Sequence, residues 1–125
     1  MEFTYPKKEK LKSKTRITQL FAKGETLTVF PIKLIYLRVD KQDALIQAGV
    51  AVPKKNFKSA VSRNHLKRLL RESYRLNKAV VFNNTEDKFT FLFLYLGKEA
   101  LPFEAVQRKM VLLLKKFNAT IQERP

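Results

Sequence analysis

The amino-acid sequence predicts an α+β fold, in which three helices and one small sheet form a two-layer sandwich. Apolar residues recur at helical spacing in three segments, over residues 14–23, 60–76 and 103–117. Between these segments lie runs rich in β-branched and aromatic residues, which favour strands. The resulting order is helix, strand, strand, helix, strand, helix, with no internal repeat and no interdomain linker.

The length of the chain predicts a single domain flanked by two short ends. A chain of 125 residues is large enough for one hydrophobic core but not for two. We expect a flexible basic N-terminal arm over residues 1–13, because that stretch is rich in lysine and contains Pro6. The α+β domain then spans residues 14–120, and residues 121–125 form a C-terminal tail.

A short helix is predicted over residues 14–23. Ile17, Leu20 and Phe21 are spaced i, i+3 and i+4, which places them on one face. Gly24 fits the position that follows a helix, where glycine is common. This helix is therefore expected to end before Gly24 and to present one apolar face.

Two strands are predicted next, over residues 30–39 and 45–52, after a loop over residues 26–29. A turn over residues 40–43 separates the two strands, which are therefore candidates for a hairpin. Both faces of the first strand are largely apolar, so it is either covered on both sides or lines a groove. The second strand has unusually small side chains at Ala48, Gly49 and Ala51. Such residues indicate either close approach of another backbone or tight packing under a helix, and the sequence leaves both open.

The second half of the chain is predicted to contain one more strand and the last helix. Residues 88–96 are nearly all apolar, which favours a central strand after a polar turn over residues 83–87. Pro102 suits the first turn of a helix. The apolar stripe of that helix predicts core packing and consists of Phe103, Val106, Met110, Leu113, Leu114 and Phe117.

The composition indicates a partner of opposite charge. Lys and Arg number 26 against 11 Asp and Glu, a net charge of +15 that attracts polyanions such as nucleic acid or an anionic membrane surface. The absence of cysteine excludes a disulfide framework and a zinc finger. Residues 1–14 lack the apolar core of a signal peptide, and the most apolar run, residues 89–96, is far shorter than the ~20 residues needed to span a bilayer. We therefore expect a soluble, cytoplasmic protein without a membrane partner.

The stretch from Lys54 to Leu76 is the most informative part of the chain. On a helical projection its leucines gather on one side, and a polar ridge covers an arc of about 100° on the opposite side. The ridge consists of Asn64, Lys67, Arg68, Arg71 and Arg75, with Arg63 at its margin. Ser59 is the predicted N-cap, because its hydroxyl can accept a hydrogen bond from a free backbone amide.

A charged helix face is often no more than a solvated surface, but two features of this ridge argue against that interpretation. Acidic partners at i, i+4 usually accompany a solvated helix, yet Glu72 is the only acid between residues 54 and 76. Asn64 adds no solubility beyond that of Lys or Arg, whereas its amide can bind a base edge or a ribose hydroxyl. Because guanidinium groups match phosphate oxygens, the ridge predicts binding to a nucleic-acid backbone.

These residues give the chain a resemblance to the protein subunit of bacterial ribonuclease P. That family's signature is a Lys-Lys pair after a strand, followed on one helix by Arg-Asn-Arg, Lys-Arg and Arg-Glu. The matching positions here are Lys54-Lys55, Arg63-Asn64-His65, Lys67-Arg68 and Arg71-Glu72. His65 replaces the second arginine of the triplet, and the projection places it away from the ridge centre. The first helix also ends in the family's Phe-x-x-Gly, at Phe21 and Gly24.

The resemblance implies a fold and an activity. The sheet would be a small mixed sheet of about four strands, with a left-handed strand–helix–strand crossover against the usual right-handed rule. The holoenzyme is an endoribonuclease that removes the 5′ leader of precursor tRNA, and its catalytic site with Mg²⁺ belongs to the RNA subunit. The protein subunit binds that catalytic RNA through the basic helix and holds the leader in a groove between the first helix and the sheet. We expect a monomer when isolated and one copy per RNA.

Two sets of binding residues follow from the ridge and from this resemblance. The predicted RNA-binding residues are Lys54, Lys55, Lys58, Arg63, Asn64, Lys67, Arg68, Arg71 and Arg75. The predicted leader groove consists of Ile17, Phe21, Tyr36, Gly49 and Ala51. Tyr36 would stack a base, but Ile35 takes that face if the strand register differs by one residue. Ordinary core packing is the alternative for Ile17 and Phe21.

We expect no catalytic residue and no metal or cofactor on the polypeptide itself. His65 is the only histidine, and a general base needs an orienting carboxylate beside it. No carboxylate cluster suited to two metal ions is evident, since Asp40 and Asp43 fit a turn. No glycine-rich phosphate loop is present among the three glycines.

Two other functions remain as alternatives. The first is a general RNA-binding or ribosome-associated protein that uses the ridge but has no leader groove. The second is a basic module for DNA or for a membrane surface. The leucine stripe is needed for the core, which disfavours the membrane. A strand and Pro53 precede the basic helix, where a helix–turn–helix would place another helix.

Overall fold

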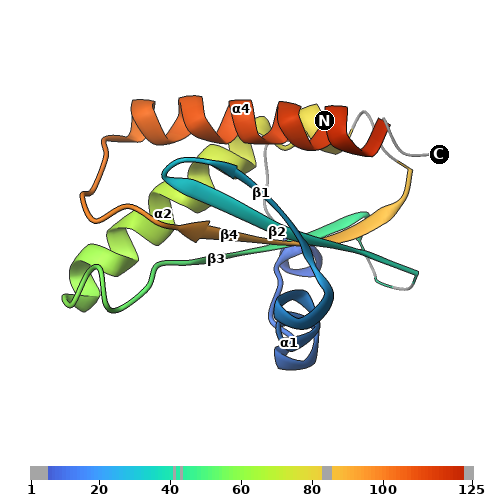
Figure 1. Cartoon of the computed structure of the whole chain (residues 1–125), viewed down its shortest axis with the longest axis horizontal. Coiled ribbons are helices and arrows are strands. Elements are labelled where there is room, and N and C mark those ends of the chain that lie inside the picture. Colours follow the sequence, from blue (N-terminus) through green and yellow to red (C-terminus); the bar gives the residue numbers. More distant parts are fainter. Residues whose placement is uncertain (1–5, 41, 43, 83–85, 123–125) are drawn as a thin grey trace.

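The computed structural model describes residues 6–40, 42, 44–82 and 86–122, and it has the predicted α+β architecture (Figure 1). Its elements are η1 (Lys7–Glu9), α1 (Lys14–Lys23), β1 (Glu25–Val29), β2 (Ile32–Val39), β3 (Ile46–Ala51), α2 (Ala60–Asn77), α3 (Ala79–Phe82), β4 (Lys88–Tyr95) and α4 (Phe103–Gln122). Parts of the predicted arm, turns and tail lie outside the described residues, namely residues 1–5, 41, 43, 83–85 and 123–125. The short helix α3 was not predicted.

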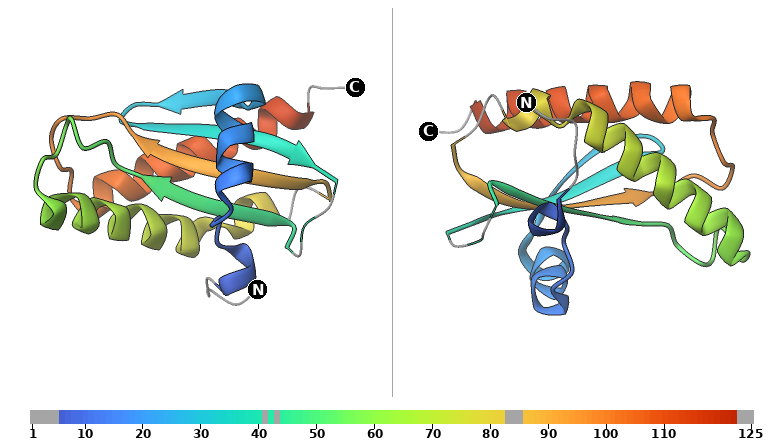
Figure 2. Two further views of the ribbon diagram at one scale, coloured as in Figure 1. Left: turned by 90° about the horizontal axis from the view of Figure 1, so that it is seen from below. Right: turned by 180° about the vertical axis from the view of Figure 1, so that it is seen from behind.

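The sheet is mixed and open, with the strand order β1-β2-β4-β3. β2 pairs antiparallel with β1 and with β4, whereas β3 pairs parallel with β4. β4 is therefore a central strand, as its apolar sequence predicted. In the left view of Figure 2 the arrows of β3 and β4 point the same way, and α2 lies behind the sheet. Seen from the side of α2 with the arrows pointing up, β4 lies to the left of β3, so β3–α2–β4 is a left-handed crossover.

Two details of the sheet were predicted wrongly. Residues 26–29 are not a loop but belong to β1, an edge strand that pairs with β2 from Glu25 opposite Tyr36 to Val29 opposite Ile32. The strands β2 and β3 do not form a hairpin, because β4 lies between them. A strand that is apolar on both faces is best buried in the middle of a sheet, and this long-range preference overrides the proximity of β2 and β3 in sequence.

The two faces of the sheet are covered unequally, as Figures 1 and 2 show. α2 and α4 lie on one face and enclose the main core, to which β4 contributes Phe89, Phe91, Phe93 and Tyr95. The α4 residues that are buried there are Val106, Met110, Leu113, Leu114 and Phe117, whereas Phe103 of the predicted stripe is only half-buried. α1 crosses the opposite face alone, over a small cluster formed by Leu11, Leu20, Ile35 and Leu92.

The ends of α1 and α2 are capped as their sequences suggest, with one difference. Ser59 is the N-cap of α2 and accepts a hydrogen bond from the backbone amide of Ser62 at 3.4 Å. Gly24 follows α1 in an extended conformation, with φ −68° and ψ 152°, so it is not a left-handed cap. A Cβ atom at Gly24 would lie 2.4 Å from the carbonyl oxygen of Leu20 and 2.7 Å from Cγ2 of Ile35. Glycine is therefore suited to this position by close packing rather than by backbone conformation.

Within the predicted arm, Lys10 and Leu11 contact the outer edge of β3. The backbone amide of Leu11 donates a hydrogen bond to the carbonyl of Ala48 at 2.9 Å, and Lys10 forms a parallel bridge with the same residue. A Cβ atom at Gly49 would lie 3.2 Å from Cβ of Leu11. The small side chains of β3 thus allow another backbone to approach closely, and that backbone is the N-terminal segment of the same chain.

Candidate nucleic-acid interface

The predicted opposition of an apolar stripe and a polar ridge is present on α2. Leu66, Leu70 and Tyr74 recur every four residues and are fully buried against the main core. On the opposite side Asn64, Arg68 and Arg71 are exposed. The same turns of helix therefore anchor α2 to the fold and present cations and one amide to the surroundings.

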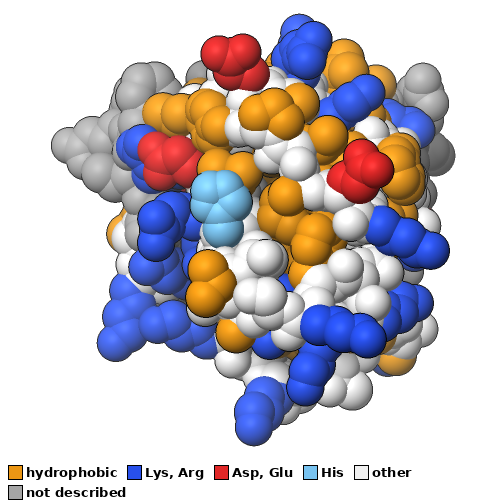
Figure 3. Space-filling model, turned by 90° about the vertical axis from the view of Figure 1, so that its left-hand side faces the viewer, with side chains coloured by type: hydrophobic (Ala, Val, Ile, Leu, Met, Phe, Trp, Pro, Cys, Tyr) orange, Lys and Arg blue, Asp and Glu red, His pale blue; other side chains and the backbone are white. Residues whose placement is uncertain are grey.

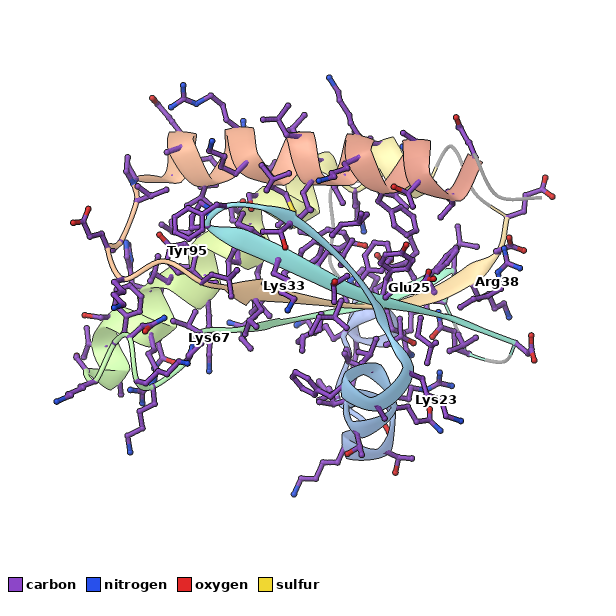
Figure 4. All side chains as sticks on the ribbon, in the orientation of Figure 1. Lys23, Glu25, Lys33, Arg38, Lys67 and Tyr95 are labelled. Atoms are coloured by element: carbon purple, nitrogen blue, oxygen red, sulfur yellow. The ribbon has the colours of Figure 1, made fainter. Side chains whose placement is uncertain are left out.

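Most of the ridge residues line one shallow hollow of about 350 Å³. Its walls are formed by Lys10, Asn64, Arg68, Arg71, Glu72 and Arg75. Lys67 is half-buried beside β3 and lies outside this hollow (Figure 4). Among the described residues, no acid forms a salt bridge with Lys67, Arg68 or Arg71. These side chains are therefore available to an external anion.

Two cations of the predicted set make contacts within the protein. Arg75 donates hydrogen bonds to the carboxylate of Glu72, one of them from Nε to Oε2 at 3.2 Å. The Arg75 hydrogen bond lowers the pKa of the Glu72 carboxyl below its ordinary value, so the pair stays ionised at neutral pH. Arg63 places Nη1 at 2.8 Å from the carbonyl oxygen of Phe57 and at 2.9 Å from that of Lys58. Arg63 therefore also fixes the loop that precedes α2.

That loop carries the remaining predicted cations. Lys54 and Lys55 lie in the turn that follows β3, and both are exposed, as is Lys58. The loop is anchored by Phe57, whose ring packs at 5.9 Å from the ring of Tyr95. Figure 3 shows this end of the molecule, where Lys and Arg side chains gather in groups around an apolar centre and few acidic side chains are present.

A second candidate surface lies beside α1. Leu20 is buried against the sheet and Ile17 packs partly over the same cluster, whereas the side chain of Phe21 is 61% exposed. Phe21 and Lys23 project to opposite sides of α1, because two residues correspond to about 200° of helix rotation. In Figure 4 Lys23 lies on the side of α1 away from Lys33, so Phe21 projects toward the Lys33 side.

On that side α1 leaves a row of sheet residues incompletely covered. The row runs across all four strands, and its register partners are Thr28, Lys33, Leu94 and Ala51. Thr28 is exposed, and the other three side chains are half-buried. An exposed aromatic ring, two apolar side chains and a lysine therefore lie on the same side of α1, with Lys54 and Lys55 just beyond the end of β3.

The prediction that Tyr36 lines this surface is wrong. Tyr36 is only 2% exposed and points to the other face, where its ring packs edge-on against Phe117 at 5.0 Å. Ile35 takes the face of α1, because successive side chains of a strand alternate between the two faces. Gly49 is on the correct face, but Leu11 packs directly over it. Of the predicted groove, only Ile17, Phe21 and Ala51 therefore border the open row.

Several residues of these surfaces were missed by the sequence analysis, among them Thr28 and Leu94 of the open row and the cations Lys33 and Lys10. Lys33 shares a strand face with Ile35, because side chains alternate along a strand. Once the pairing register is known, this alternation places Lys33 on the face that carries α1. Lys10 lies within the predicted arm, more than 50 positions before the ridge with which it shares a hollow. No local sequence pattern indicates a contact over such a separation.

The described part of the chain offers no evident site for metal or acid–base chemistry. It contains no group of three or more His, Asp or Glu side chains placed to hold a metal ion. His65 is exposed on α2. No helix within the described ranges is long and apolar enough to cross a bilayer. The arrangement is instead one of cations, amides and aromatic rings on a rigid support, which suits the binding of single-stranded or folded nucleic acid.

Comparison with known proteins agrees with this assignment. A family profile described as Ribonuclease P matches residues 5–118. The ribonuclease P protein component of Porphyromonas gingivalis is 34% identical over 112 residues, which cover 86% of this chain and 82% of that relative. The RNase P protein from Thermotoga maritima superposes with a TM-score of 0.71 at 26% identity, over 86% of this chain and 96% of that one. The Staphylococcus aureus RNase P protein, at 18% identity, has the same fold, with a TM-score of 0.71 over 87% of this chain and 94% of that one.

Proposed function

Because the chain belongs to the ribonuclease P protein family, we propose that it binds the RNA subunit of that enzyme through α2 and holds the 5′ leader of precursor tRNA beside α1. As a member of this family, the chain is a subunit of an endoribonuclease, and its partner is the ribonuclease P RNA.

The observation that carries the RNA-binding part is the hollow on α2. Arg68 and Arg71 line it without a salt bridge to any described acid, and a guanidinium group binds phosphate oxygens through two parallel hydrogen bonds. Asn64 lies in the same hollow, where its amide can contact a ribose hydroxyl or a base edge. The exposed Lys54, Lys55 and Lys58 extend this cationic surface along the preceding loop.

The leader is assigned to the open row beside α1. Single-stranded RNA is bound by stacking of bases on aromatic rings together with cations along the backbone. Phe21 supplies an exposed ring, and Ile17, Leu94 and Ala51 supply an apolar floor beside it. Lys33 within the row, and Lys54 and Lys55 beyond the end of β3, would contact leader phosphates.

We assign hydrolysis of the phosphodiester bond to the RNA subunit with its Mg²⁺ ions. The protein contributes charge and position: its cations lower the repulsion between RNA phosphates, so less Mg²⁺ is needed to hold the RNA fold. Contacts to the leader raise the affinity for precursor over mature tRNA, because only the precursor has a leader. One monomer per RNA is sufficient for this division of labour.

The RNA-binding part is tested by comparing Arg68→Ala and Arg71→Ala with Arg108→Ala, an exposed arginine on α4. Binding to bacterial ribonuclease P RNA is measured over a range of salt concentrations. The α2 variants should bind more weakly, with a salt slope shallower by about one, because each loses one phosphate contact. Equal losses of RNA affinity in all three variants would show that α2 is not part of the interface.

The division of labour is tested by cleavage. The purified protein should restore cleavage of precursor tRNA by the catalytic RNA at a low Mg²⁺ concentration, chosen so that a control without protein shows no cleavage. Tight binding without any stimulation of cleavage would instead favour a general RNA-binding protein.

A further inference from the structure

The N-terminal segment of residues 6–11 forms a strap that leads from the edge of the sheet to the hollow on α2. Its path is set by hydrogen bonds to β3: Leu11 donates to the carbonyl of Ala48, and Nε2 of Gln47 donates to the carbonyl of Lys8 at 3.1 Å. Leu11 is buried in the small cluster beneath α1. Backbone and side-chain contacts therefore both make the strap part of the folded domain.

A buried ion pair ties the other side of this strap to α2. Oε1 of Glu9 lies 2.7 Å from Nζ of Lys78, and these residues are 7% and 2% exposed. Lys78 is the C-cap of α2, the helix that carries the ridge. In contrast, the salt bridge between Arg38 and Asp87 is mostly exposed to solvent. Removal of one partner of a buried pair leaves an uncompensated charge, so each of Glu9 and Lys78 holds the other in place.

Lys10 stands between the two attachments of the strap. Its neighbour Glu9 is held by Lys78, and its neighbour Leu11 is held by β3. Lys10 lines the α2 hollow together with Asn64, Arg68, Arg71, Glu72 and Arg75. The hollow thus has cations on two sides, one from the strap and several from α2. An anion bound in the hollow would therefore lie near cations of both elements.

We propose that Lys10 contacts an RNA backbone phosphate in the α2 hollow, and that the Glu9–Lys78 ion pair is the device that positions it. This inference rests on the proposed function of α2 and adds a binding residue from outside that helix. A lysine on a freely moving arm would lose backbone freedom on binding, whereas the strap holds the backbone of Lys10 in place before RNA arrives. Lys10 is therefore a binding residue, and Glu9 and Lys78 are positioning residues.

The contact is tested with Lys10→Ala, and Lys12→Ala is the matched control. Lys12 is exposed, lies two residues further along the chain and does not line the α2 hollow. With the full chain and bacterial ribonuclease P RNA, Lys10→Ala should weaken binding roughly threefold more than Lys12→Ala, with a salt slope shallower by about one. In a double-mutant cycle Lys10→Ala and Arg68→Ala should be non-additive, because both contact one phosphate, whereas Lys12→Ala and Arg68→Ala should add.

The positioning role is tested by replacing both charges of the buried pair with Glu9→Gln and Lys78→Met, which avoids a lone buried charge. Circular dichroism and thermal unfolding establish that this double variant folds. In it, Lys10→Ala should have a smaller further effect on RNA affinity than in the parent protein, because only the contacts with β3 then hold the strap. An undiminished effect of Lys10→Ala in this background would overturn the role of the pair.

The same measurements separate this inference from the proposed function. If Arg68→Ala weakens binding but Lys10→Ala behaves like Lys12→Ala, the strap makes no contact and α2 remains the RNA-binding element. If Arg68→Ala also leaves RNA affinity unchanged, both the proposed function of α2 and the inference about Lys10 are wrong.

Discussion

The two faces of the sheet differ in how much they bury. Among the described residues, the face beneath α2 and α4 has a core of nineteen buried side chains, and the face beneath α1 has a cluster of four. The first face can therefore supply most of the stability of the domain, because stabilisation grows with the apolar area removed from water. The second face leaves an incompletely covered row and the exposed ring of Phe21, so apolar surface remains open to a ligand there.

Strand β4 shows this division within adjacent residues. Phe91 is fully buried in the main core, where its ring packs at 4.8 Å from that of Phe117. Leu92, the next residue, belongs to the small cluster on the other face. One strand thus serves both faces through period-two alternation, and neighbouring substitutions can separate the two roles.

The largest expected effect comes from Phe91→Ala. Loss of a fully buried ring should lower the free energy of unfolding by about 3–5 kcal/mol. Leu92→Ala should cost about 2–3 kcal/mol, at the low end for a buried leucine, because the thin cluster around it can collapse or admit water. Urea unfolding of both variants measures the difference. Equal losses would contradict the division between a stabilising face and a binding face.

The next effect concerns how tightly α1 packs on its face. Gly24→Ala places a Cβ atom 2.4 Å from a backbone oxygen of Leu20, which cannot move without unwinding the end of α1. We expect a loss of about 1–3 kcal/mol in urea unfolding. Gly49→Ala is the matched control, because its Cβ atom would meet Leu11 at 3.2 Å and a strap can shift slightly. A larger loss at Gly49 than at Gly24 would reverse this order.

Phe21→Ala is expected to change function more than stability. The ring is 61% exposed, so the free energy of unfolding should change by no more than about 0.5 kcal/mol. Affinity for the RNA subunit should also be retained, while the holoenzyme loses part of its preference for precursor over mature tRNA. Phe30→Ala is the control, since Phe30 is 66% exposed but lies in the turn between β1 and β2. An unchanged leader preference in Phe21→Ala would exclude this ring from the leader site.

The smallest effect is a pH dependence at the edge of the hollow. The pKa of Glu72 is lowered by its hydrogen bond to Arg75, so the pair stabilises the fold above the pKa of an unfolded glutamate. That stabilisation is lost as the pH falls through the lower, folded pKa. The difference in Tm between the parent protein and Glu72→Gln should therefore be present at neutral pH and vanish in acid. A difference that persists or grows in acid would contradict the pairing.

Patterns with a short period were predictable from the sequence. The bounds of α1, the Ser59 cap and the buried leucines of α2 follow from helical spacing and from side-chain hydrogen bonding within one turn. The central place of β4 follows from its unbroken apolarity. Strand β1 was missed because edge strands carry polar residues, and such a sequence resembles a loop. Tyr36 was misplaced because the pairing of a strand with its neighbours decides which of its two faces lies beneath which helix.

The sequence by itself determined that this chain is a basic α+β protein with a cationic ridge opposite a leucine stripe, because helical and strand periodicities are local properties of the chain. The tertiary structure alone decided which cations share a hollow, which strand face lies beneath α1, and that Glu9 meets Lys78 across 69 positions. Contacts of that kind depend on how the elements pack in space. Residues that meet only through loop closure and burial show no periodic pattern in the sequence.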